Sequence, residues 1–169
     1  MSARPAAIEP LVDQFSTDPI RHALAEALFA GALPDEVAGL SVEEAARIVD
    51  FAAATAATRP AGQPAIRLES LEGQPGRRRM ALAIVNDDMP FLVDSVSAAI
   101  GAHNLSIDRL LHPIIESSRD ASGALSGIGA GGHRESLIYI ELERVGARAR
   151  GELVDQLETV LADVRAAVD

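Results

Sequence analysis

Apolar positions recur with a helical period in the first third of the chain. In residues 19–30 and in residues 42–57 they return every three or four positions, which predicts two amphipathic helices. Thr17 or Asp18 is placed to cap the first helix, and the Ser-Val-Glu-Glu run at 41–44 is typical of a capping box at the start of the second. We therefore expect a pair of helices with capped N-termini.

The segments that flank these helices differ from them. We expect residues 1–17 to be a loosely ordered lead. Residues 59–64 read Arg-Pro-Ala-Gly-Gln-Pro, and this density of proline and glycine ends a helix and is typical of a linker. These patterns divide the chain into an N-terminal helical arm with its linker, residues 1–60, and a second unit, residues 61–169.

Beyond the linker the hydrophobic period becomes that of β-strands, interrupted by two helical stretches. The strands are expected at residues 65–71, 79–85, 105–115 and 136–142, and the helices at 92–100 and from 146 onward. We expect a turn at 72–76 and a Gly/Ser-rich loop at 117–134. Asp88 is placed to cap the helix that follows it, with Pro90 in the first turn.

From residue 79 the order strand, helix, strand, strand, helix is that of a ferredoxin-like unit without its last strand. Strand 65–71 can form a hairpin with strand 79–85 and fill the edge where that last strand would lie. Pro113 cannot donate a backbone hydrogen bond, which places its strand at an edge of the sheet. The pattern predicts an α+β fold, an antiparallel sheet with helices on one face, plus the N-terminal helical arm.

Composition narrows the classes of function. The 169-residue chain carries a net charge of −10, which repels nucleic acid and anionic membrane surfaces, so neither is an expected partner. No apolar run reaches the roughly 18 residues of a membrane span and no secretion signal is visible, so we expect a cytoplasmic protein. There is no cysteine, and all 15 basic residues are arginine, which excludes thiolate metal sites and cysteine or lysine catalysis.

One run of residues carries a family resemblance. Residues 86–96 read Asn-Asp-Asp-Met-Pro-Phe-Leu-Val-Asp-Ser-Val. Together with Leu-His-Pro-Ile at 111–114, Arg-Asp at 119–120 and Glu-Ser-Leu-Ile at 135–138, this run resembles the N-terminal region of the large bacterial NAD-specific glutamate dehydrogenases. The resemblance covers about residues 20–169.

The resemblance implies an ACT-like βαββα domain, here at residues 61–169 with an extra N-terminal strand, far upstream of the catalytic part. The parent enzyme would convert glutamate to 2-oxoglutarate and ammonia and reduce NAD. Deamination in that family needs a lysine and a nucleotide-binding fold, and this segment has neither, so NAD is expected in the parent and no cofactor in the segment. No catalytic residue and no metal ligand is expected in this segment.

The resemblance also implies a candidate effector site. In ACT domains the turn from strand to helix helps to bind an amino acid, and here that turn comprises Asn86, Asp87, Asp88, Met89, Pro90 and Phe91. Backbone amides at the helix N-terminus would bind the effector carboxylate, and the aspartates its ammonium. The alternative is that the Asn and Asp residues only cap the helix and shape the turn. Many amino-acid-binding ACT domains have glycine after the proline, whereas this chain has Phe91, whose ring would fill the ligand space.

The remaining motifs favour structural roles. Residues 127–132 match the GxGxxG pattern, but a loop precedes them and a strand follows, so a hairpin loop is favoured over a dinucleotide site. None of the four histidines has metal-ligand spacing, and His112 beside Pro113 is expected to be an ordinary strand residue. The Arg-Arg-Arg run at 77–79 is expected to be a solvated strand entry, with an acidic neighbour as the alternative contact.

Three functions follow, in decreasing order of support. The first is a regulatory or assembly domain whose partly uncovered sheet pairs with a second copy or docks on the rest of the parent enzyme. The second is an amino-acid sensor that binds its effector at residues 86–91. The third is a self-contained enzyme, which is the weakest because lysine, cysteine and a clustered acid/base motif are lacking.

Overall fold

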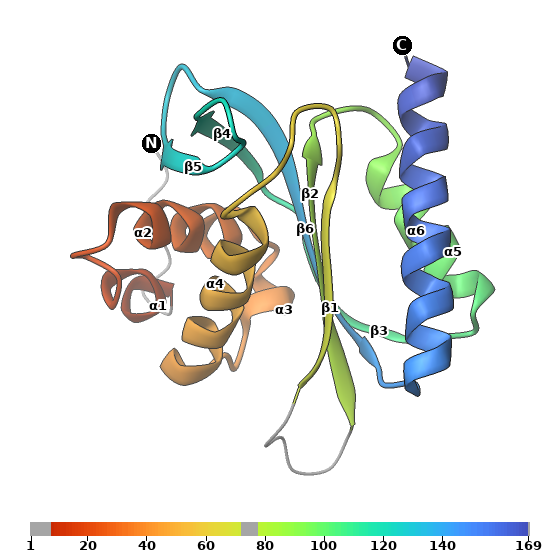
Figure 1. The fold of residues 1–169 in the computed structure, drawn as a ribbon. Coiled ribbons are helices and arrows are strands. Elements are labelled where there is room, and N and C mark those ends of the chain that lie inside the picture. The colour runs from red at the N-terminus through yellow and green to blue at the C-terminus, as the bar shows by residue number, and fades with distance from the viewer. Residues whose placement is uncertain (1–7, 72–77, 169) are drawn as a thin grey trace.

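The structure is a computed structural model that describes residues 8–71 and 78–168. It is an α+β fold in which helices lie on both sides of one antiparallel sheet (Figure 1). The elements are α1 (Glu9–Asp13), α2 (Pro19–Ala25), the π-helical turn η2 (Glu26–Ala30), α3 (Pro34–Val37), α4 (Val42–Ala56), β1 (Ala65–Leu71), β2 (Arg79–Asp87), α5 (Leu92–Ala102), β3 (Ile107–Leu111), β4 (Ile114–Arg119), β5 (Leu125–Ile128), β6 (His133–Glu143) and α6 (Ala147–Val168). The predicted turn at 72–76, Arg77 and the first seven residues of the predicted lead lie outside the described residues.

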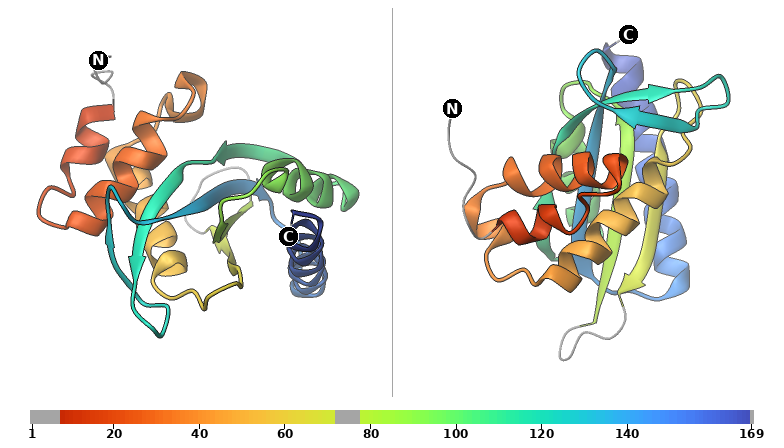
Figure 2. Two further views of the ribbon diagram at one scale, coloured as in Figure 1. Left: turned by 90° about the horizontal axis from the view of Figure 1, so that it is seen from above. Right: turned by 90° about the vertical axis from the view of Figure 1, so that its left-hand side faces the viewer.

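The sheet has six described strands in the order β1-β2-β6-β4-β5, with β3 also paired to β6. The hairpin predicted from the edge-strand argument is confirmed, because β1 pairs with β2 in antiparallel register from Ala65↔Val85 to Leu71↔Arg79. Strand β2 pairs in turn with β6 along its whole length. The sheet curls around the N-terminal helices, as the view from above shows (Figure 2).

The predicted strand at 105–115 is two strands, β3 and β4, which lie one after the other along the same edge of β6. His112 and Pro113 separate them, and the Pro113 carbonyl still accepts a hydrogen bond from the Leu137 N–H at 3.0 Å. Because proline has no N–H to donate, the ladder breaks at this point. Beyond it β4 pairs with β5, so the predicted loop at 117–134 is wrong in part: it contains the end of β4, all of β5 and the start of β6.

The two faces of the sheet bury two separate apolar clusters. Alternate residues of β2, represented by Leu82 and Ile84, face α5 and α6 and pack against Val96, Leu157 and Leu161. This face is the one that the sequence predicts to carry helices. Its helices are close to prediction: α5 was expected at 92–100 and α6 from 146 onward.

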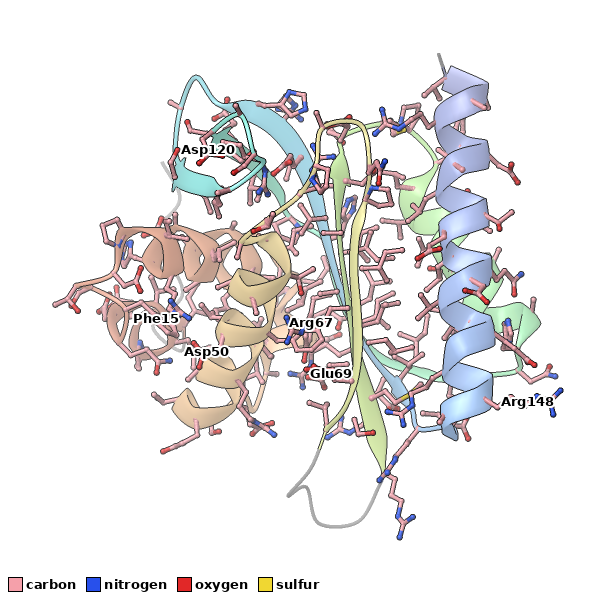
Figure 3. The ribbon with its side chains drawn as sticks, viewed as in Figure 1. Phe15, Asp50, Arg67, Glu69, Asp120 and Arg148 are labelled. Atoms are coloured by element: carbon pink, nitrogen blue, oxygen red, sulfur yellow. The ribbon has the colours of Figure 1, made fainter. Side chains whose placement is uncertain are left out.

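The opposite face of the sheet is also covered by helices, which corrects the prediction of helices on one face. Ala81, Val85 and Tyr139 belong to one core cluster with residues of α1, α2, η2 and α4. On this side Phe51 of α4 meets the Tyr139 ring edge-on at a centroid distance of 6.2 Å. Asp50 of α4 and Arg67 and Glu69 of β1 lie on the same side of the sheet (Figure 3). The helices at 9–56 therefore share a core with the sheet.

The predicted helix starts in the N-terminal region are confirmed. The Asp18 carboxylate accepts a hydrogen bond from the Arg21 N–H at 3.1 Å, and Ser41 and Glu44 form the reciprocal capping box. The predicted loose lead at 1–17 is wrong for its described part, because α1 buries Leu11 and Val12 completely. Within the described residues, no helix combines the length and the apolar character needed to cross a bilayer.

Candidate functional site

The predicted effector turn lies between the end of β2 and the start of α5. Along it, exposure rises from Asn86, which is 1 % exposed, to Phe91, which is 68 % exposed. The four residues between them alternate between half-buried and exposed: Asp87, Asp88, Met89 and Pro90. The structure places Asn86 and Asp87 at the end of β2 and the other four residues in the connection to α5, and it directs their side chains to different places.

Asp88 does not cap α5, which corrects the prediction, and Pro90 precedes the helix. The Asp88 carboxylate instead accepts hydrogen bonds from Arg134 and Ser136, each at 3.2 Å, and so holds the turn against β6. The N-cap position is taken by Phe91, which makes no side-chain hydrogen bond. Helix α5 therefore starts with backbone amides that no side chain caps.

Phe91 adopts a left-handed backbone conformation, with φ of 71°. This region costs a residue with a Cβ atom about 1–2 kcal/mol and is the natural place for glycine. The ring is largely exposed. A strained and exposed aromatic residue is thus held at the start of α5.

Asp87 is the centre of a cluster of charged side chains. Its Oδ1 atom lies 2.5 Å from Arg59 Nη2 and 2.7 Å from His133 Nε2. Its Oδ2 atom lies 2.8 Å from Arg165 Nη2 of helix α6. One carboxylate at the end of β2 therefore binds two guanidinium groups and one imidazole from three separate segments.

Glu135 of β6 is a second carboxylate of this cluster, and it is completely buried. Its Oε2 atom accepts hydrogen bonds from Arg59 Nε at 2.6 Å and from Arg119 Nε at 3.1 Å, and its Oε1 atom accepts one from Arg119 Nη2 at 3.0 Å. Arg59 is only 3 % exposed. We call Asp87, Glu135, Arg59, Arg119 and Arg165 the arginine–carboxylate network.

The network also binds backbone carbonyls and ties distant parts of the chain together. Arg59 Nη1 donates to the Gln63 carbonyl at 2.7 Å, and Arg119 Nη1 donates to the carbonyls of Ala56 and Gly123 at 2.7 and 2.8 Å. The predicted linker at 59–64 is therefore anchored at its first residue. It joins the end of α4 to the sheet through a buried arginine.

The electrostatics of the two carboxylates follow from burial and these donors. Burial alone would raise the pKa of Asp87, but hydrogen bonds from His133, Arg165 and Arg59 outweigh it and hold that pKa below the ordinary value. Burial likewise opposes ionisation of Glu135, and the Arg119, Ser117 and Arg59 contacts still lower its pKa. Both groups are ionised at neutral pH.

A close backbone approach supports the network from the β4–β5 hairpin. Gly123 has φ of +89°, and a Cβ atom added there would lie 2.3 Å from the Arg59 carbonyl oxygen. The Arg59 N–H donates to the Gly123 carbonyl at 3.0 Å, and Asp120 shapes the same turn by accepting from Ser122 and Ala124 (Figure 3). Only glycine fits this contact between the hairpin and Arg59.

Sequence reasoning missed most of the network. Only Asp87 was named as a site residue; Arg119 and Glu135 entered through the family resemblance with no assigned role, and Arg59 was placed in a linker. A usable signal was Glu135 itself, a charged residue at the start of a strand that otherwise runs apolar from 137 to 140. Such a residue, once buried, requires a cationic partner.

The other candidate groups have local roles. His103 hydrogen-bonds Gln156, and His133 contacts Asp87. His112 is exposed at the surface, and partial desolvation still lowers its pKa despite the nearby Asp88 carboxylate. Residues 8–71 and 78–168 contain no group of three or more His, Asp or Glu arranged to hold a metal ion.

In the Arg-Arg-Arg run, Arg78 is exposed while Arg79 Nη1 lies 3.3 Å from the mostly buried Glu141.

Two pockets lie on either side of the arginine–carboxylate network. One, of 380 Å³, is lined by Arg59, Asp87, Arg119 and His133 and lies against the β4–β5 hairpin. The other, of 690 Å³, lies between the C-terminal half of α6 and residues 62–66, with Asn86 and Arg165 in its wall. Asp87 and Glu135 already accept hydrogen bonds from arginine side chains, so neither carboxylate is placed to take a proton from a substrate.

Most of the chain matches a known protein family. Residues 24–157 match the family model described as glutamate dehydrogenase, ACT1 domain. A 94-residue stretch is 33 % identical to the NAD-specific glutamate dehydrogenase of Halomonas elongata, covering 52 % of this chain and 6 % of that protein. No solved structure matched the chain. Since the family model spans most of its length, the chain belongs to the glutamate dehydrogenase ACT1 domain family.

Proposed function

We propose that this chain is a non-catalytic regulatory or assembly segment of a large NAD-specific glutamate dehydrogenase. The observation that carries the proposal is the family match over residues 24–157. In the relative named NAD-specific glutamate dehydrogenase, the aligned part is only 6 % of the protein's length. The parent would deaminate glutamate to 2-oxoglutarate and reduce NAD elsewhere in its length. We also interpret β2, α5, β3/β4, β6 and α6 as the ferredoxin-like part of the fold.

The charged side chains support a non-catalytic role. The network joins α4, the β4–β5 hairpin, β2, β6 and α6, so its carboxylates and guanidinium groups stabilise the packing of these five elements. The sequence also has no lysine and no cysteine to act on a substrate.

Assembly would use an edge of the sheet and not its second face. The second face of the sheet is covered by α1, α2 and α4 of the same chain, so it needs no partner. Strand β1 remains an edge of the described sheet, and Phe91 remains exposed at the start of α5. Self-association or docking on the parent enzyme would involve these features.

The proposal is tested at two levels. The isolated chain with glutamate and NAD should form no NADH, and sedimentation of the chain should report its self-association. In the full-length relative, deletion of the corresponding segment should leave the chemical step intact while changing the oligomeric state or the response to effectors. NADH formation by the isolated chain, or a deletion that changes neither property, would refute the proposal.

A second candidate function is amino-acid sensing at residues 86–91. The observation that favours it is the start of α5, where the backbone amides lack a side-chain cap. Thermal unfolding in the presence of individual amino acids tests it. A midpoint that stays constant at millimolar concentrations of every amino acid would discard it.

A further inference from the structure

The larger of the two pockets has the features of a ligand site. We call it the α6 pocket: a hollow of 690 Å³ between α6 and residues 62–66 that shares only Asn86 with the predicted effector turn. Its two sides are fixed in place, because α6 is anchored by the buried Leu157 and Leu161 and the segment opposite by the hydrogen bond from Arg59 to the Gln63 carbonyl. The pocket is therefore formed before any ligand arrives.

One end of the α6 pocket presents hydrogen-bond donors that the protein uses incompletely. Asn86 is 1 % exposed, yet its side chain makes only long hydrogen bonds, at 3.3 Å to the Asp87 carbonyl and at 3.4 Å from Arg165. Arg165 makes both of its described hydrogen bonds through Nη2, and its Nε and Nη1 atoms have no described partner. The pair can thus bind an added acceptor without giving up its present contacts.

The charge around this end favours an anion. The arginine–carboxylate network contains three arginines and two carboxylates, so it carries one excess positive charge even with His133 neutral. The ion pair between Arg165 and Asp87 also fixes the guanidinium plane. A planar carboxylate matches a guanidinium edge and an amide N–H better than a spherical anion does.

The remainder of the α6 pocket is apolar and ends at an acid. Ile66 and Leu161 form apolar walls, and Ala162 leaves space between them. Glu158 lies two helical turns from Arg165, about 10 Å along the α6 axis. A second negative charge on the ligand would meet Glu158, whereas an ammonium group would be attracted to it.

From this geometry we infer that the α6 pocket binds a small carboxylate with an apolar body and a single negative charge. Its carboxylate lies on Arg165 and Asn86, its body on Ile66 and Leu161, and its far end near Glu158. This site is distinct from the α5 start that the second candidate function would use, and it does not depend on the proposed role in the parent enzyme.

Three six-carbon probes test the ligand class on the 169-residue chain: hexanoate, 6-aminohexanoate and adipate. Binding is followed by titration calorimetry and by the chemical shifts of backbone amides on α6. We expect hexanoate to bind with a Kd of about 1 mM. We expect 6-aminohexanoate to bind at least as tightly and adipate about five-fold more weakly, with the adipate penalty removed by Glu158→Gln.

Two variants locate the binding site, and a matched variant controls for changes to the helix. Ala162→Phe fills the pocket and should weaken hexanoate binding about ten-fold, as should Arg165→Gln. Ala167→Phe places the same ring on an exposed position of α6 outside the pocket and should leave the Kd unchanged. Far-ultraviolet circular dichroism and the unfolding midpoint show that each variant is folded, and Ala162→Phe retains the whole network.

Two results would overturn the inference. One is the absence of saturable binding of all three probes at about 20 mM, more than ten times the expected Kd. The other is hexanoate binding that Ala162→Phe and Ala167→Phe affect equally. Neither result bears on catalysis or assembly of a parent enzyme, so the two proposals fail separately.

Discussion

The buried carboxylate of Glu135 should be a major determinant of stability. The substitution Glu135→Gln keeps the shape of the side chain and removes its charge, while Arg59 and Arg119 remain in place. Both arginines are then left largely buried beside a neutral amide, whose NH2 group can donate but not accept. The perturbation therefore isolates the charge of one group in the network.

The magnitude follows from the contacts that are lost. Glu135 accepts three hydrogen bonds from two guanidinium groups, at 2.6, 3.0 and 3.1 Å. The amide oxygen of glutamine can replace part of this set, and removal of one partner of a buried ion pair costs about 3–5 kcal/mol. Allowing for the retained acceptor, we expect a loss of about 3 kcal/mol, a large part of the roughly 5–15 kcal/mol available to a domain of this size.

Urea unfolding at pH 7, followed by circular dichroism at low temperature, measures this loss. The midpoint should fall while the m-value stays constant, because the variant changes stability and not the surface exposed on unfolding. The control is Glu152→Gln, which removes the partner of Arg148 in an ion pair of 3.5 Å whose side chains are 61 % and 95 % exposed. Arg148 extends away from the body of the protein (Figure 3), and this control should leave the midpoint unchanged.

A loss below about 1 kcal/mol for Glu135→Gln would refute the reasoning, since the network would then contribute no more than a surface pair. The pH dependence gives an independent check. The folded-state pKa values of Glu135 and Asp87 lie below their ordinary values of 4.5 and 3.8, so their contribution is complete above about pH 5 and is lost as the pH falls below about 4.5. The loss of stability in acid should be less steep for Glu135→Gln than for the unsubstituted chain.

Three further predictions concern single residues. Phe91→Gly should be more stable than Phe91→Ala by about 0.5–1 kcal/mol in urea unfolding, because only the alanine keeps a Cβ atom at φ of 71°; equal stabilities would argue against strain at this position. Gly123→Ala should lower the free energy of unfolding by about 2–4 kcal/mol, because its Cβ atom would lie 2.3 Å from the Arg59 carbonyl oxygen. In Gly127→Ala the added Cβ atom meets no atom within 4 Å, so this control should be tolerated. Similar unfolding midpoints for the two variants would contradict the close approach. Desolvation lowers the pKa of His112, so the unfolded chain binds a proton more readily and stability should fall as the pH drops through about 6.5. His112→Asn should make the dependence of stability on pH less steep between about pH 7.5 and 5.5. An unchanged pH dependence would assign it to other groups.

Local patterns predicted most of the elements correctly. The capping residues Asp18, Ser41 and Glu44 act on backbone groups three positions away, and such interactions are visible in a short window of sequence. The hairpin of β1 and β2 followed from two alternating segments joined by a short connection. The turn between β2 and α5 was also placed correctly, although the residue that caps the helix was not.

The failures involve contacts between residues far apart in the chain. Arg59 and Glu135 are 76 positions apart, and proline and glycine around Arg59 are typical of a linker whether or not the arginine is buried. The short strand β5 contains glycine and is separated from β4 by five residues, which favours the interpretation as a loop. Nothing in a local window distinguishes these cases.

The cover on the second face of the sheet was predictable in part. Residues 80–85 are apolar on both alternating faces of β2, and all six are buried. A strand that is apolar on both sides indicates a sheet covered on both sides. The alanine-rich inward face of α4, which includes Ala45, Ala52 and Ala56, was the available cover. Sequence alone did not show that these two surfaces meet.

The shared core between α4 and the sheet affects how the polypeptide should be divided for expression. A fragment that begins at residue 61 retains every strand but loses the helices that shield Val85, Leu137 and Tyr139. Those side chains would then face water, and Glu135 and Asp87 would lose the guanidinium of Arg59. Such a fragment would be prone to aggregation, so the helices at 9–56 belong with the sheet in any shorter fragment intended for study on its own.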